Sequence, residues 1–166
     1  RNTMTTKMPY VVVDNFPGLG LMTALRFLEW VAENPNGVIS LPTGKTPEYF
    51  IKWTKYMLNN WDSPESVRIR EENGLFLKDK PSLKGLHFVQ IDEFYPINPR
   101  QHNSFFDYVS KFYIDGFDLD PEKALLINTE EIILAEGKHY SEVFPDNTID
   151  LTLRNREAVS RLEKLQ

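Results

Sequence analysis

The chain has 166 residues, of which 41% are hydrophobic and 26% charged, values typical of one globular domain with a substantial core. Its net charge of −5, with lysines and arginines scattered among acids, excludes a general nucleic-acid binder, which needs a basic surface. It has no cysteine and no apolar run near the roughly 20 residues of a membrane span, so we expect a cytoplasmic protein without disulfides, thiolate chemistry or membrane contact.

The first third of the chain alternates between strand-like and helix-like patterns. A β-branched run at residues 10–13 predicts a first strand, and apolar residues at helical spacing predict a helix over 21–31 that the turn at 34–37 ends. Residues 38–41 predict a short buried strand followed by a turn. The next helix is expected to have Thr46 as its N-cap and Pro47 at its first position, and to run to Leu58.

A polar stretch at about 62–84 interrupts this alternation and predicts an excursion over the surface, interpreted as part of a lid. Within it, the run Asp62-Ser63-Pro64-Glu65 can cap a short helix that Gly74 ends. Beyond it, residues 86–91 predict a third strand, 104–113 an aromatic-rich helix, 124–127 a fourth strand and 130–144 a further helix. The helical pattern at 154–165 has no stop signal, so we interpret the chain as a fragment of a longer protein.

Strands that alternate with helices favour an α/β fold with a mainly parallel sheet. In such sheets, ligands bind beyond the carboxyl ends of the strands. Two loops with unusual chemistry are predicted at that edge, one after Leu41 and one after Ile91. If their strands are neighbours, both loops face one crevice.

The loop after Leu41 offers many hydrogen-bond donors. The hydroxyls of Thr43 and Thr46, the ammonium of Lys45 and the start of a helix would together suit a phosphate monoester, and Gly44 gives the backbone freedom. A nucleotide P-loop is disfavoured, because Ile39 stands where that motif needs glycine. A turn whose residues serve only geometry explains the same pattern equally well.

The loop after Ile91 begins with two acids. A carboxylate such as that of Asp92, at the end of an apolar strand, can act as a base in a cleft, or it can cap a turn or pair with a lysine. His102 is a candidate substrate ligand or proton carrier, with a structural histidine as the alternative. No two histidines have metal-ligand spacing, so no metal site is predicted.

Taken together, these segments resemble the glucosamine-6-phosphate deaminase family. Residues 38–47, VISLPTGKTP, are similar to its "LGLPTGxTP" phosphate loop, and residues 88–94, FVQIDEF, to its "FNMDEY" segment; residues 98–106 align with a third motif. Order and spacing match over roughly residues 10–130. The resemblance implies a Rossmann-like three-layer α/β fold with a mainly parallel sheet, incomplete at its C-terminal end. Residues 1–166 would be the N-terminal part of a single sugar-phosphate isomerase/deaminase-like domain.

The resemblance also implies a reaction, the conversion of glucosamine 6-phosphate and water to fructose 6-phosphate and ammonia without a cofactor. Asp92 would move the C2 proton, with Glu93 in support and His102 as a further substrate contact. The substrate phosphate would be bound by Thr43, Gly44, Lys45 and Thr46. The partner is then a small sugar phosphate, and the intact protein is expected to be a homo-oligomer.

The chain departs from the family pattern at Lys45, Phe94 and His102. The family's later "GxGxDGHIAFNEP" motif, which supplies further catalytic groups, is absent from these 166 residues. The chain by itself is therefore expected to be inactive. Two other functions stay open: a sugar-phosphate-binding or regulatory domain that has lost its chemistry, and a hydrolase like the related 6-phosphogluconolactonases.

Overall fold

The computed structural model describes residues 8–151, so the helix predicted at 154–165 lies outside the described residues. None of the helices in residues 8–151 is long and apolar enough to cross a membrane. In chain order the elements are α1 (Phe16–Glu33), β1 (Val38–Ile39), α2 (Glu48–Asn59), α3 (Pro64–Glu72), β2 (His87–Val89), α4 (Phe105–Val109), β3 (Ala124–Leu125) and α5 (Tyr140–Val143). The helix α4 continues as a π-helix over Ser110–Asp115.

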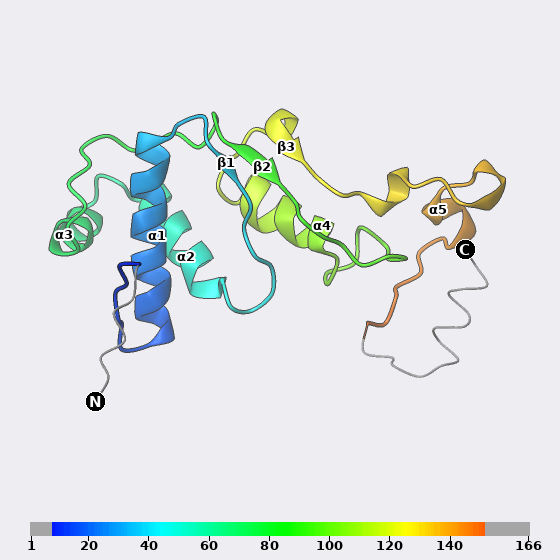
Figure 1. The fold of residues 1–166 in the computed structure, drawn as a ribbon, viewed down its shortest axis with the longest axis horizontal. Coiled ribbons are helices and arrows are strands. Elements are labelled where there is room, and N and C mark those ends of the chain that lie inside the picture. Colours follow the sequence, from blue (N-terminus) through cyan, green and yellow to red (C-terminus); the bar gives the residue numbers. More distant parts are fainter. Residues whose placement is uncertain (1–7, 152–166) are drawn as a thin grey trace.

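The three strands form one parallel sheet in the order β1-β2-β3 (Figure 1). Ile39 and Phe88 are paired in register, and their buried side chains join the core beneath the helices. On the opposite face, Val38 and Leu125 are 66% and 70% exposed, so the helices described cover one face of the sheet. The prediction of a Rossmann-like α/β fold with a parallel sheet is confirmed.

The core centres on the packing of α1 against α2. The helix α1 begins five residues earlier than its apolar pattern indicates, because the Asn15 side chain accepts a hydrogen bond from the Gly18 N–H at 2.8 Å and caps its first turn. Where α1 meets α2, a Cβ on Gly20 would lie 2.8 Å from the Phe50 nitrogen. Glycine at this position therefore allows the two helices to approach closely.

The prediction that Thr46 caps α2 with Pro47 at the first helical position is wrong. The helix begins at Glu48, Pro47 precedes it, and no side chain caps its start. The reason is a turn in the backbone, in which the Glu48 N–H already donates to the Lys45 carbonyl at 3.2 Å. The Thr46 hydroxyl is therefore not used as a cap.

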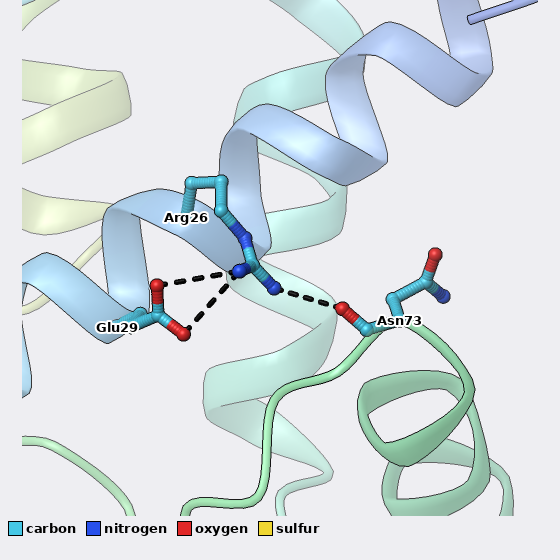
Figure 2. Close-up of polar contacts among 3 residues, drawn as sticks. All are labelled: Arg26, Glu29 and Asn73. Atoms are coloured by element: carbon cyan, nitrogen blue, oxygen red, sulfur yellow. Dashed lines mark hydrogen bonds and ion pairs between the residues drawn. The ribbon is translucent and has the colours of Figure 1, made fainter. Parts of the chain in front are cut away.

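The polar excursion contains the predicted short helix, α3. Its start is capped by the Ser63 hydroxyl, and it ends before Gly74, whose φ of 77° suits a helix terminus. Figure 2 shows how α1 holds this end: Arg26 donates to the Asn73 carbonyl oxygen at 2.8 Å and also pairs with Glu29. In Figure 1, α3 lies on the side of α1 away from the sheet, so the excursion does not cover the loops that follow β1 and β2.

The predicted strand at 10–13 does not form. These residues are irregular, and Tyr10 and Val12 are 72% and 80% exposed. A β-branched run becomes a strand only where a sheet edge pairs with it, and the sheet described pairs no strand with this segment.

The helix predicted at 130–144 is also wrong. In its place are two single 3-10 turns, Thr129–Glu131 and Ala135–Gly137, followed by the four-residue α5. Glu136 and Gly137 have φ of 62° and 72°, which interrupts any continuous helix. The Glu130 carboxylate instead accepts hydrogen bonds from the backbone and hydroxyl of Ser141, which folds the segment back on itself.

Candidate functional site

The two loops that carry the candidate residues leave neighbouring strands. Val38 of β1 pairs in parallel with His87 of β2, so the loops that follow these strands leave the same edge of the sheet (Figure 1). This is the arrangement in which parallel α/β sheets bind ligands.

Asp92 follows β2 and presents a free carboxylate. The side chain is exposed, and among residues 8–151 it has no hydrogen-bond or ion-pair partner, so Asp92 neither caps a turn nor pairs with a lysine. Its backbone is held by the buried side chain of Gln90, which donates to the Asp92 carbonyl and accepts from the Ile127 N–H, both at 2.9 Å. The loop after β2 is thereby fastened to the chain that follows β3.

Glu93 has a different environment from Asp92, because its carboxylate is fully engaged. It accepts from the N–H groups of Phe94, Phe105 and Phe106 at 2.9, 3.0 and 2.8 Å, and from the Ser104 hydroxyl at 2.7 Å. These contacts cap the N-terminus of α4, where a negative charge is also favoured by the helix dipole. Glu93 therefore fixes the loop after β2 to α4 and has no oxygen left for substrate.

The loop after β1 is held by two tyrosines from the same helical segment. Tyr108 donates to the Gly44 carbonyl at 2.8 Å, and Tyr113 donates to the Pro42 carbonyl. Burial raises the pKa of both phenols, and the Glu48 carboxylate adds to the rise at Tyr108. Both hydroxyls therefore keep their protons at neutral pH and remain donors.

One helical segment thus contacts both candidate loops, with its N-terminus at Glu93 and its flank against Pro42 and Gly44. The Tyr113 ring is buried in the core, while its hydroxyl holds the loop after β1, a role that the aromatic pattern of residues 104–113 did not predict. The available signal was the presence of tyrosine in place of phenylalanine, because a buried phenol needs a partner.

The side chains of the phosphate-loop candidates are free. Thr43 is half-buried, Lys45 and Thr46 are exposed, and in the described part of the chain none has a hydrogen-bond or ion-pair partner. Gly44 adopts a φ of 93°, which glycine accommodates best. Thr46 also lines a cavity of about 260 Å³ whose other walls are mainly apolar side chains from α1 and from the loop after β1, with Phe50 of α2.

His102 lies in an exposed turn near the end of the segment that joins β2 to α4, and its side chain has no hydrogen-bond or ion-pair partner in residues 8–151. The flanking Asn98 and Gln101 are buried and engaged. Asn98 donates to the Asn147 carbonyl at 3.0 Å, and the Gln101 amide pairs with both the N–H and the carbonyl of Ile149. Within the same residues, no group of three or more metal-ligating side chains is placed to hold a metal ion.

No protein-family model matches this chain, and no curated protein matches it. Among solved structures it is similar to a monomeric glucosamine-6-phosphate deaminase described as a missing link of the NagB superfamily. The two share 19% sequence identity with a TM-score of 0.52, over 70% of this chain and 41% of that one. At this identity the likeness shows the fold alone, and this chain spans about two-fifths of the deaminase's length.

Proposed function

We propose that this chain carries the first part of an amino-sugar-phosphate deaminase site, with Asp92 as its base. The observation that carries the proposal is the unpartnered carboxylate of Asp92 at the carboxyl end of β2, on a backbone held by Gln90 and Glu93. A catalytic base needs a free carboxylate on a rigid support, since small displacements cost much of the rate. The fold similarity to a glucosamine-6-phosphate deaminase supports the same assignment.

The proposed chemistry starts from the opened form of glucosamine 6-phosphate. Asp92 takes the proton from C2, which the neighbouring C1 carbonyl acidifies, and the electrons of that bond form the C1–C2 double bond of an enolamine. At the same time the C1 carbonyl π electrons move to its oxygen, which takes a proton from solvent. Return of the proton to C1 leaves an iminium at C2. Water adds there and ammonia leaves, which yields the ketone of fructose 6-phosphate.

The loop after β1 would hold the phosphate of this substrate. Its hydroxyls, its ammonium and its backbone N–H groups are the donors, and Tyr108 and Tyr113 support the loop from behind without contacting the ligand. The phosphate-binding residues in this proposal are Thr43, Gly44, Lys45 and Thr46. Glu93 acts as a positioning residue only, because all its contacts are to α4 and the adjacent backbone.

A second candidate function is binding of a sugar phosphate without turnover, as in a sensor domain. It is favoured by the engagement of Glu93, whose carboxylate is used by α4 and the adjacent backbone, so that Asp92 is the acid of this adjacent pair that is free to react. The family resemblance implies a homo-oligomer, which we propose for the intact protein. The similar deaminase, in contrast, is described as monomeric.

The test measures binding of glucosamine 6-phosphate by calorimetry on this chain, and release of ammonia by a coupled assay on the longer protein that the family resemblance implies. For the base assignment, Asp92→Asn should lower ammonia release by about 100-fold or more while binding stays measurable. The matched control is Asp79→Asn, an exposed aspartate of the excursion without a partner in residues 8–151. Binding without ammonia release by the unaltered longer protein would support the sensor, and absence of binding by both proteins would contradict both functions.

A further inference from the structure

The chain around α3 encloses a cavity that is separate from both candidate loops. The volume of the cavity is about 270 Å³. The helix α3 lies on the side of α1 that faces away from the sheet (Figure 1). Four charged side chains and several apolar ones form its walls. The residues that line the cavity include Asp62, Arg70, Glu71, Leu75, Phe76 and Lys78.

Arg70 is a buried cation in the wall of this cavity. It is only 3% exposed, and its guanidinium carbon lies 3.7 Å from the centre of the Trp61 ring. One terminal nitrogen donates to the Trp61 carbonyl at 2.7 Å and to the Ser66 hydroxyl at 2.8 Å. Both acceptors are neutral, and no carboxylate of the described residues lies within ion-pair distance. A charge buried in this way is costly unless an anion accompanies it.

The nearby acids do not supply that anion. Burial lowers the pKa of Arg70, and the opposing effect of Asp62 and Glu71 does not offset it. Both carboxylates belong to exposed residues, so solvent screens their charge. Lys78, also exposed, brings a second cation to the cavity and has no ion-pair partner in the part of the chain described. The remaining guanidinium nitrogens of Arg70 likewise donate to no protein group there.

We propose that this cavity binds a phosphate-type oxyanion between Arg70 and Lys78. The guanidinium plane is fixed by its stacking on Trp61, which prepares it for charge-assisted hydrogen bonds to phosphate oxygens. The cavity is larger than a bare phosphate needs, and Leu75 and the 77% exposed Phe76 add apolar wall beside the two cations. These features favour a phosphate monoester with a small apolar group over inorganic phosphate. The proposal is independent of the deaminase assignment.

Trp61 provides a local reporter for the test. Its indole N–H donates to the carbonyl of Lys78 at 3.0 Å, so an anion between Arg70 and Lys78 should shift the indole NMR resonance. The chain has three tryptophans, and Trp30 and Trp53 serve as internal controls. Inorganic phosphate and phenyl phosphate are each titrated against sodium chloride of equal ionic strength. A saturable shift of the Trp61 signal is expected with both, at a lower concentration for phenyl phosphate.

Charge variants of opposite sign make the proposal falsifiable. Lys78→Ala should weaken phosphate binding about fivefold, the effect of one exposed charge contact, and Lys55→Ala on α2 is its matched control. Asp62→Asn should tighten binding about twofold or more, because it removes a repulsive charge from the wall. Arg70→Lys should weaken binding more than Lys78→Ala does, and a thermal melt checks that this variant is folded.

The outcomes separate this site from the proposed phosphate loop. If Lys45→Ala leaves the Trp61 shift intact while Lys78→Ala weakens it, the anion binds beside α3. Inorganic phosphate that binds as tightly as phenyl phosphate would contradict the apolar wall and leave a free-phosphate site. If the Trp61 signal does not move at about 50 mM of either probe, or moves equally in Lys78→Ala and Asp62→Asn, the proposal is wrong.

Discussion

The loops after β1 and β2 leave the same sheet edge, yet they are held in opposite ways. In the loop after β2, the side chain of Glu93 forms four hydrogen bonds, three of them to α4 and its cap residue, while Asp92 beside it forms none. In the loop after β1, the side chains are free and the carbonyls of Pro42 and Gly44 are held by tyrosines from another element. The loop after β2 is therefore held by one of its own side chains, and the loop after β1 is held by side chains of another element.

This difference separates support from chemistry. A residue that holds the structure has its polar atoms saturated, and a residue available to a ligand does not. By this criterion Glu93, Tyr108 and Tyr113 are supports, while Asp92 and Lys45 are available. Removing a support should therefore cost stability, and removing an available group should cost almost none.

Removal of the largest support should have the largest effect. Glu93→Ala leaves the first N–H groups of α4 without their acceptor and should lower the free energy of unfolding by about 2 to 3 kcal/mol. Chemical denaturation monitored by circular dichroism measures it. Glu131→Ala, an exposed glutamate whose side chain makes no hydrogen bond or ion pair in residues 8–151, is the control and should stay within about 0.5 kcal/mol. Equal losses in the two variants would remove the distinction between the loops.

Loss of the tyrosine contact that holds the loop after β1 should lower the stability less than loss of Glu93. Tyr113→Phe deletes the hydrogen bond to the Pro42 carbonyl and should cost about 1 kcal/mol, with faster exchange of the amide hydrogens of residues 43–46. Tyr56→Phe is a matched control, because that half-buried phenol has no partner in the residues described. Unchanged exchange in the loop of Tyr113→Phe would show that the tyrosine does not hold it.

Alkaline pH tests the same contact without a mutation. Because burial raises the pKa of Tyr113 in the folded state, the folded protein retains a proton that the unfolded chain loses above pH of about 10. The contribution of Tyr113 is therefore fully present below that pH and is lost as pH rises, by about 1 kcal/mol at pH 11. The free energy of unfolding of Tyr113→Phe should fall less steeply with pH than that of the unaltered chain. Equal slopes for the two proteins would show that the pKa of Tyr113 is not raised by burial.

The smallest effect on stability is expected at Asp92. Asp92→Asn removes no contact within residues 8–151, so the free energy of unfolding should stay within about 0.5 kcal/mol of the unaltered chain. Denaturant titration of this variant beside Glu93→Ala places adjacent acids at opposite ends of one scale. A loss above about 1 kcal/mol at Asp92 would assign it a structural role and weaken its candidacy as a base.

Sequence patterns predicted the elements whose signals are local. The short helix after residues 62–65 and the helix that starts near Ser104 are found, and the apolar runs at 38–41, 86–91 and 124–127 contain the shorter strands β1, β2 and β3. The failures need information from elsewhere in the fold. Residues 10–13 have strand composition without a pairing edge, and residues 130–144 are folded back by the contact from Glu130 to Ser141.

In the candidate site, too, the features that depend on local sequence could be predicted, and the features that depend on distant contacts could not. The position of Asp92 at a strand end follows from the apolar run before it, and its freedom from partners could not be read from the chain. The capping of α4 by Glu93 joins residues eleven to thirteen positions apart, beyond any capping pattern within a helix. The role of Gln90 depends on a neighbour from the chain after β3, which only the sheet order reveals.

The π-helix at Ser110–Asp115 determines which way Tyr113 faces relative to Tyr108. In a regular α-helix, side chains five positions apart, such as Tyr108 and Tyr113, point roughly 140° away from each other. The wider π turn, bonded from residue i to i+5, brings them toward one side, where their rings lie 6.0 Å apart and both hydroxyls reach the loop after β1. If the same residues formed a regular α-helix, Tyr113 would turn away from Tyr108 and from Pro42. The single widened turn therefore decides whether two phenols or only one can hold the loop after β1.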